Sequence, residues 1–489
     1  MTSLGIELSD AGLLVAHGDE GNISLVPPAG SSGAEEWPGF ACAGERGLVF
    51  GRAAEELWFV HPRRISCNFW SRLAHEPSGL LSNGKPVAFS ELAFFHLRDF
   101  VAKVSAAAPS PGSAVLALPG DYLRDTVTEE EKVGLVLGMV GELRLPVSGM
   151  VDHACAALCD PRGPAFSPSL PVLVVDTGLE GSDLTLITQD GARLTRRAFA
   201  RLPQSGLAAL LKQLTGSFGN RFLRHTTFDI LEDGRIEQEF FRQLKDFLWS
   251  EASEFRFVIN TATRAYEMPA KNEQLTSDAQ AFTATFGQSV QAFLQRHLPA
   301  GAPFTLALTD RAARLPGLSA RLRSCGPTRQ IRLARGAAAA GAAHLARRWL
   351  RTPADLADVP VETSVPRAEA AGSQHARARI HLHKPAGPAS PAIPTHAILG
   401  GIGYPLGTGP GFIIGSADQH PQLALPSGFS HVPGCVARFT FEGGSFWWQD
   451  TSGDGQNRVA VAAGDRMTFS SDELAAEVLF AHCPAPARG

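Results

Sequence analysis

Residues 171–187, which read PVLVVDTGLEGSDLTLI, constrain the fold of this chain more than any other stretch. They begin with a continuous apolar run, 172–175, which is typical of a strand buried on both faces. A turn with two glycines and two carboxylates follows, and a second strand comes after it. Such a turn can place backbone N–H groups against phosphate oxygens, and an aspartate there can hold Mg²⁺. The alternative is an ordinary buried hairpin with no ligand.

Residues 4–16, LGIELSDAGLLVA, repeat this order of apolar strand, carboxylate, tight turn and second strand. Taken alone, the segment indicates a simple hairpin near the N-terminus. The match with 171–187 favours a pair of related hairpins, about 170 residues apart, which would give two related parts of the fold one phosphate-binding turn each.

Length, composition and charge exclude several classes of protein. A chain of 489 residues is too long for one ordinary core, so we expect two or three domains. The net charge of −4 gives no electrostatic basis for binding nucleic acid or an anionic membrane, and no apolar stretch approaches the ~20 residues of a membrane span. The N-terminal residues lack the features of a signal peptide. The seven scattered cysteines indicate reduced thiols, and we expect a cytoplasmic protein.

Several segments, taken in chain order, resemble the nucleotide-binding domain of DnaK-type (heat-shock) chaperones. They are GIELSDAG, FWSRL, AVLALPGDYLRD, RLPVSGMVDHACAAL, VVDTGLEGSDL, FTLALTDRAARLPGLSARL and RGAAAAGAAH. The resemblance covers residues 1–350. It implies a two-lobed α/β ATPase fold of the actin and DnaK type with ribonuclease-H-like lobes, each of which presents one phosphate-binding turn to a shared cleft.

The resemblance also implies where ATP and Mg²⁺ would bind. It gives Glu7, Asp152 and Asp176 as candidate catalytic carboxylates, with Asp176 holding Mg²⁺ if ATP binds. The candidate nucleotide-binding positions are Asp10, Gly12, Asp176, Thr177, Gly178, Gly181, Ser182 and Thr309.

The chain departs from the family at the positions that matter for hydrolysis. The family's catalytic lysine aligns with Ser71, and the threonine pair of the first turn becomes Asp10-Ala11. Glu180 adds a further carboxylate to the second turn. These changes remove a cation and add acidic side chains where a polyphosphate would lie. Loss of one preorganised group commonly costs ~10²–10³ in rate, so we expect a pseudo-ATPase. The alternative is an active DnaK-like ATPase with a rearranged site, in which Glu7 and Asp176 hold Mg²⁺.

The composition changes after residue 350. Residues 351–393 are rich in Pro and Ala and predict a linker. Residues 394–489 contain short strands separated by Gly, Pro, Ser and Asp turns, which predicts an all-β sandwich. This part resembles a forkhead-associated domain through Gly415, Asp450 and the Gly464-Asp465 turn.

The forkhead-associated resemblance lacks the residues that read phosphothreonine. The family's phosphate-binding arginine is replaced by Ser416, and its serine-arginine loop is represented by residues 429–433, which include Ser430 and His431. Without an arginine there is no bidentate phosphate clamp, so phosphopeptide binding is not expected. Trp447 and Trp448 are adjacent in a predicted strand, so one should point outward and could anchor a partner, unless a loop half-covers it. The candidate partner-binding residues are Ser416, Ser430, His431, Trp447 and Trp448. The sequence thus predicts an adaptor or assembly subunit that acts through protein–protein contacts.

Overall fold

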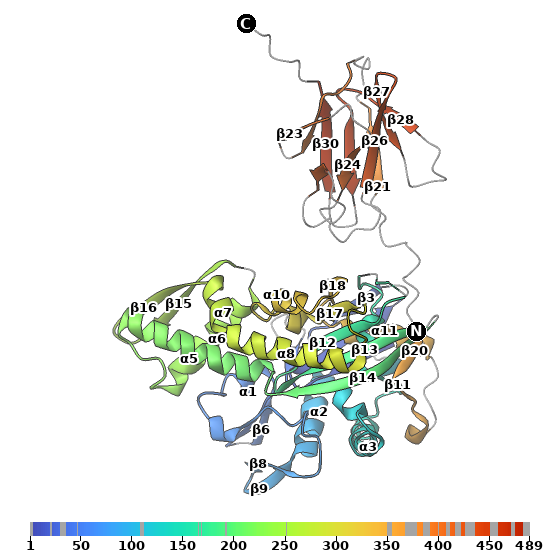
Figure 1. The fold of residues 1–489 in the computed structure, drawn as a ribbon. Helices are drawn as coiled ribbons and strands as arrows, with labels where there is room; N and C mark the ends of the chain where they lie inside the picture. The colour runs from blue at the N-terminus through green and yellow to red at the C-terminus, as the bar shows by residue number, and fades with distance from the viewer. Residues whose placement is uncertain are drawn as a thin grey trace. The chain divides into compact units, whose positions relative to one another are not determined.

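The computed structural model divides the chain into two compact units, Met1–Ala368 and Glu369–Gly489. The fold is mixed α/β with several sheets (Figure 1). The structure describes residues 3–19, 22–29, 36–45, 47–107, 112–164, 166–167, 169–190, 193–250, 252–349, 355–366, 379–384, 392–399, 401–406, 411–415, 422–425, 436–449, 458–470 and 475–482.

The first sheet of unit 1 has the strand order β19-β11-β10-β1-β2-β3, with β4 beside β2. Strand β1 is antiparallel to β2 and parallel to β10, which is in turn parallel to β11. The bounds are β1 Ser3–Leu8, β2 Gly12–Asp19, β3 Asn22–Leu25, β4 Trp37–Pro38, β10 Ser113–Leu118, β11 Val147–Asp152 and β19 Val361–Glu362.

The second sheet repeats this topology. Its order is β18-β17-β12-β13-β14-β20; β12 is antiparallel to β13 and parallel to β17, which is parallel to β18. Strands β1 and β12 therefore occupy equivalent central places, and each runs directly into its turn and hairpin partner. The bounds are β12 Val172–Thr177, β13 Gly181–Asp190, β14 Arg193–Pro203, β17 Thr305–Leu308, β18 Arg329–Arg332 and β20 Ser364–Pro366.

Helices and small sheets are inserted between these strands. Around the first sheet they are α1 Arg52–Glu55, α2 Phe89–Ala107 and α3 Thr126–Glu142, with β5 Ala41–Gly44, β6 Gly47–Phe50, β7 Ile65–Ser66, β8 Pro77–Ser82 and β9 Lys85–Ala88. Between β14 and β17 lie α5 Leu207–Thr226, α6 Gly234–Trp249, β15 Glu254–Asn260, β16 Ala265–Lys271, α7 Asn272–Asp278 and α8 Gln280–His297. The remaining helices are α4 His153–Leu158, α9 Asp310–Ala313, α10 Leu318–Arg323 and α11 Ala337–Arg348.

The continuous apolar run of β12 is explained by its burial on both faces. Leu173 and Val175 pack into the largest core with α5 and α6, while Val172 and Val174 pack into the core around α4 and α11. Because successive side chains of a strand point to opposite faces, both sets must be apolar. The sequence expectation of a strand buried on both faces is therefore confirmed.

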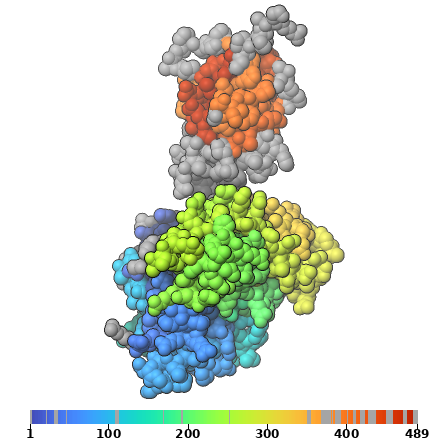
Figure 2. Space-filling view, turned by 90° about the vertical axis from the view of Figure 1, so that its left-hand side faces the viewer, coloured from blue at the N-terminus to red at the C-terminus, as the bar shows by residue number. Residues whose placement is uncertain are grey.

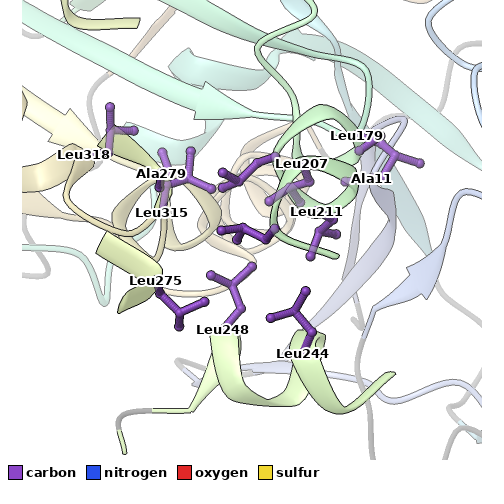
Figure 3. Packing of buried hydrophobic residues seen from close by; sticks show 14 of the residues in the cluster. Ala11, Leu179, Leu207, Leu211, Leu244, Leu248, Leu275, Ala279, Leu315 and Leu318 are labelled. Carbon is purple, nitrogen blue, oxygen red and sulfur yellow. The ribbon is translucent and has the colours of Figure 1, made fainter. Parts of the chain in front are cut away.

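The largest core also draws the two hairpin turns together. Figure 3 shows Ala11, from the turn after β1, beside Leu179, from the turn after β12, and both lie near Leu207 of α5. Helices α5 to α8 contribute side chains to this core, and the residues of this part of the chain, drawn green to yellow, form a continuous surface in Figure 2. The predicted apolar face of α6 is confirmed, because Phe240, Phe241, Leu244 and Phe247 are all buried.

Helices α4 and α11 form a layer that packs against both sheets. The contact is close: a Cβ added at Gly341 of α11 would lie 1.7 Å from the carbonyl oxygen of Ala156 on α4. Only glycine allows these two backbones to approach so closely. The alanine-rich composition of α11 follows from the same requirement.

A short segment after α11 joins the edges of both sheets. Strand β19 pairs in parallel with β11, and β20 pairs antiparallel with β14. Val359 packs into the core of the first sheet and Val365 into the core around α4 and α11. Residues 361–366 are thus ordered strands within the stretch that the sequence predicted as linker, because their alternate apolar residues find a core that composition alone does not reveal.

Unit 2 contains two five-stranded sheets, β21-β29-β30-β22-β23 and β25-β24-β26-β27-β28. Side chains from both sheets share one core, which includes Phe412, Phe439, Met467, Val478 and Phe480. The bounds are β21 Arg379–His383, β22 His396–Leu399, β23 Ile402–Pro405, β24 Phe412–Gly415, β25 Leu423–Ala424, β26 Val436–Glu442, β27 Ser445–Gln449, β28 Arg458–Val461, β29 Arg466–Ser470 and β30 Ala475–Ala481. Strand β21 also lies within the stretch predicted as linker. In the part of the chain that is described, no helix has the length and apolarity needed to cross a membrane.

Candidate functional site

The turns after β1 and β12 are joined by hydrogen bonds. Asp10 Oδ1 accepts a hydrogen bond from the backbone N–H of Leu179 at 2.7 Å, and Asp10 Oδ2 accepts one from the N–H of Glu180 at 3.1 Å. Asp10 is buried. The carboxylate therefore takes backbone N–H donors that were expected to face phosphate oxygens.

The position of Gly178 follows from this contact. A Cβ at residue 178 would lie 2.1 Å from Asp10 Oδ1, so no other residue type fits there without displacing the carboxylate. Gly178 N–H donates to the carbonyl oxygen of Gly181 at 2.8 Å, which closes the turn. A Cβ at Gly12 would meet the Trp37 carbonyl oxygen at 2.7 Å, so this glycine serves packing between β2 and β4.

Arg201 of β14 neutralises two carboxylates in the cleft. Its Nη2 lies 3.0 Å from Asp10 Oδ2, and its Nη1 lies 2.9 Å from Asp183 Oδ1. Burial raises the pKa of Asp183 to about 7, although the Arg201 guanidinium acts in the opposite direction. The ion pair with Asp183 is thus at full strength only above neutral pH.

Arg311 of α9 fills the space between the other acidic residues. Its Nη2 lies 2.7 Å from Glu7 Oε1, and its Nη1 lies 2.9 Å from Glu36 Oε1. Its Nε donates to the carbonyl oxygen of Thr177 at 3.1 Å, and Asp176 Oδ1 lies 3.7 Å from Nη2. The guanidinium is buried, so these are low-dielectric ion pairs.

His153, at the start of α4, adds a second cation beside the same carboxylates. Its Nε2 lies 3.3 Å from Glu7 Oε1, and its Nδ1 lies 3.7 Å from Asp176 Oδ2. Burial lowers the pKa of His153, but Asp176 and Glu7 outweigh burial and raise it to about 9. Burial raises the pKa of Glu7, but Arg311 and His153 outweigh it and lower that pKa to about 2. At neutral pH His153 is therefore a cation and Glu7 an anion.

Both oxygens of Asp152, another of the candidate catalytic carboxylates, are bound by groups of the protein. Its Oδ1 accepts from the N–H groups of Ala154 and Cys155 at 2.9 and 3.1 Å, which caps α4. Its Oδ2 pairs with Arg196 Nη1 at 2.8 Å, and neither side chain is appreciably exposed. Asp152 thus joins the end of β11 to β14, and both of its oxygens face donors of the protein.

The remaining predicted nucleotide-binding residues lie close to the second turn. Thr309 Oγ1 donates to Asp176 Oδ1 at 2.7 Å. Ser182 Oγ donates to the carbonyl oxygen of Ser205 at 2.7 Å and lies 3.2 Å from Thr177 Oγ1. Ser182 and Thr177 are buried, so their hydroxyls support the turn from inside.

A lysine lies beside Ser71, although it comes from another element. Lys132 Nζ of α3 is 2.9 Å from Asp121 Oδ2 and 3.5 Å from the carbonyl oxygen of Ser71. The expectation that the cleft has lost its cation is therefore wrong, since Lys132, Arg201, Arg311 and His153 compensate the acidic residues. Lys132 and Arg201 lie outside the segments that resemble the family, and although Arg311 and His153 lie inside such segments, a sequence motif does not show which carboxylates a side chain faces.

The residues do not fit Mg²⁺. Both oxygens of Asp176 already face donors or cations, namely the Thr309 hydroxyl, Arg311 and His153. Mg²⁺ requires near-octahedral oxygen ligands and several waters. Within the described residues, no group of three or more His, Cys, Asp or Glu side chains is arranged to hold a metal ion.

Two cavities adjoin the network. The first, about 20 Å³, is lined by Asp10, Ser71, Asp121, Asp176 and Arg201 among others, and has room for about one water molecule. The second, about 140 Å³, is lined by Glu7 and Arg311 and is bordered by Trp249, Arg314 and the N-terminus of α11.

Of the candidate partner-binding residues of unit 2, the structure describes the two tryptophans. Ser416, Ser430 and His431 lie outside the described residues, as does Asp450. Trp448 is buried in the core of the unit, whereas Trp447 is partly exposed and donates its Nε1–H to the carbonyl oxygen of Glu442 at 3.3 Å. Asp465 is buried, and its carboxylate accepts from the N–H of Ala462 at 2.9 Å, which fixes the Gly464-Asp465 turn.

Comparison with known proteins gave no assignment: no family model and no curated protein matches this chain.

Proposed function

We propose that unit 1 is a DnaK-type, actin-like nucleotide-binding fold that no longer hydrolyses ATP and serves as a protein-binding scaffold. In this proposal unit 2 is a forkhead-associated-like module that binds a protein surface without requiring phosphate. The chain would then act as an adaptor or assembly subunit.

The fold part of the proposal is supported by the repeated sheet topology. In each sheet the central strand is followed by an antiparallel hairpin partner on one side and two parallel strands on the other. The two turns that follow β1 and β12 lie against each other. Paired ribonuclease-H-like lobes with facing turns are what the resemblance implies.

The observation that carries the loss of hydrolysis is the position of Arg311. Its guanidinium contacts Glu7 and Glu36 and lies near Asp176, so a fixed protein cation stands where the family would place a metal and phosphates. Removing one partner of a buried ion pair commonly costs ~3–5 kcal/mol. A nucleotide that displaced Arg311 would have to supply that free energy before any net binding.

The protein-binding part rests on two features. A scaffold needs a shape that persists without a ligand, and the contacts of Asp10, Arg311 and the Asp152–Arg196 pair supply cross-links between the two sheets. The partly exposed Trp447 offers unit 2 an aromatic side chain of the type enriched at binding hot spots.

Phosphate release from MgATP by the full chain tests the proposal. The proposal predicts a rate at background, equal for the wild type and for Asp176→Asn. The active-ATPase alternative predicts release well above background that Asp176→Asn abolishes, and that result would overturn the proposal.

A further inference from the structure

Three donors from the second sheet converge on the Asp10 carboxylate. They are the N–H groups of Leu179 and Glu180, at 2.7 and 3.1 Å, and Arg201 Nη2, at 3.0 Å. Asp10 is separated from them by 169, 170 and 191 residues along the chain. The contact is therefore tertiary, unlike the local caps that Asp125 and Asp152 make with amides two or three residues away.

The donors have the composition of an oxyanion site. Successive backbone N–H groups in a glycine-containing turn form a concave anion-binding surface, and an arginine adds a charge-assisted donor. The turn is also shaped around its occupant, because a Cβ at residue 178 would lie 2.1 Å from Asp10 Oδ1.

The other carboxylates near the turn do not occupy its donors; Asp10 does. The Glu180 carboxylate is within 3.4 Å of Cys67 Sγ and does not pair with Arg201 in the structure as described. Asp183 takes the other arginine nitrogen, Nη1, at 2.9 Å, so Nη2 remains for the occupant of the turn.

We propose that residues 178–181 and Arg201 form an oxyanion-binding site that the chain itself occupies with the carboxylate of Asp10. An external oxyanion, a carboxylate or an inorganic phosphate, then binds only when the turn at residues 9–11 withdraws. The inference rests on the proposed loss of nucleotide use, because an internal carboxylate and a nucleotide phosphate compete for the same donors.

The site has a consequence for the whole of unit 1. Asp10 belongs to the first sheet and its three donors belong to the second, so the same contact is a bridge between sheets. An external oxyanion and this bridge exclude each other. Since a tethered group competes at an effective concentration on the order of millimolar or above, the wild-type site is closed to dilute anions.

The test is chemical rescue of Asp10→Ala in the full chain. The melting temperature is measured with increasing formate or inorganic phosphate, against chloride at matched ionic strength. The account predicts that Asp10→Ala melts below the wild type and recovers about 2 °C or more, saturably, with formate or phosphate. The wild type should show no saturable rise. If Asp10→Ala does not fold, Asp10→Ser, whose shorter side chain also leaves room for formate, is measured in the same way.

Two further variants make the result specific. Adding Arg201→Gln to Asp10→Ala should abolish the rescue. Asp125→Ala, which removes an exposed carboxylate that caps α3, should lose stability without rescue by formate. Equal responses of Asp10→Ala and wild type, rescue by chloride, or rescue that survives Arg201→Gln would overturn the inference. Phosphate release from MgATP that is well above background and is abolished by Asp176→Asn would instead contradict the proposed function, and formate rescue of Asp10→Ala is read independently of it.

Discussion

Arg311 Nη2 lies 2.7 Å from Glu7 Oε1, and the two side chains come from opposite sheets: Glu7 from β1 and Arg311 from α9, which follows β17. Both are buried, so water screens their attraction little. The ion pair therefore links the two sheets at the place where the resemblance would put a ligand. The stability of unit 1 should therefore depend on residues that in an active site would be dispensable for folding.

Arg311→Gln should destabilise unit 1 by about 3–5 kcal/mol, because it leaves Glu7, Glu36 and Asp176 without their main cation. Urea denaturation followed by circular dichroism measures the change. The matched control is Arg256→Gln, which breaks the exposed Arg256–Glu267 pair and should cost no more than about 1 kcal/mol. Equal effects of the two substitutions would show that the Arg311 network carries no special stability.

The stability of unit 1 should fall as the pH rises above neutrality. Since the folded-state pKa of His153 is raised from 6.5 to about 9, its contribution is complete below pH 6.5 and disappears as the pH passes 9. The loss of stability is on the order of 3 kcal/mol. His153→Gln should flatten the slope between pH 8 and 9, where Asp183, with a pKa of about 7, is already largely ionised. A slope that persists in His153→Gln would assign it to another group.

At acid pH the stability of unit 1 should change in the opposite direction and fall as the pH is lowered. The folded-state pKa of Glu7 is lowered from 4.5 to about 2, so its contribution is present above pH 4.5 and is lost as the pH falls toward 2. Glu7→Gln should reduce stability at pH 7 and weaken the dependence on pH below 4.5. Unfolding curves at a series of acid pH values measure both effects. An unchanged acid slope in Glu7→Gln would contradict the assignment.

Two glycines in helices should respond oppositely to alanine. Gly341→Ala places a Cβ 1.7 Å from the Ala156 carbonyl oxygen, so the α4–α11 contact must open and folding should fail or weaken strongly. Gly138→Ala in α3 meets no atom within 4 Å and should stabilise the helix by about 0.5–1 kcal/mol. Melting temperatures of the two variants decide the matter. A stable Gly341→Ala protein would mean that the two helices are not in this contact.

The reactivity of Cys155 and Cys159 should show how firmly residues 361–366, which join the edges of the two sheets, are held. Both are fully buried; their Sγ atoms lie 3.5 and 3.6 Å from the carbonyl oxygens of Thr363 and Pro366. Val365→Ser weakens the anchoring of this segment and should accelerate alkylation of both thiols by tenfold or more, on the order expected for a loss of ~1.4 kcal/mol. Cys42, buried elsewhere, is the internal control. Parallel acceleration at Cys42, measured by mass spectrometry, would indicate global unfolding instead.

Local patterns predicted the elements of unit 1 better than its contacts. The apolar run of β12 and the aromatic face of α6 are written in neighbouring residues, and both are confirmed. The partners of Asp10 lie 169 residues or more away, so no local pattern could indicate that this carboxylate would be neutralised rather than repelled. Arg201 and Arg311 were missed for the same reason, since an arginine in a strand or short helix has no sequence signal for what it faces. Residues 361–366 were missed because Pro and Thr obscure strands that depend on both sheet edges.

The central claim is that side chains of the protein fill the place of a nucleotide's phosphates and metal. Titration of the full wild-type chain with MgATP, followed by the melting temperature, tests it most directly, because any ligand that binds the folded state stabilises it by mass action, by about 2.7 kcal/mol at 100 times its Kd. The account predicts a melting temperature that does not change with MgATP beyond the change produced by a non-nucleotide salt of equal ionic strength. A melting temperature that rises with MgATP concentration, and that loses this rise in Asp176→Asn, would contradict it.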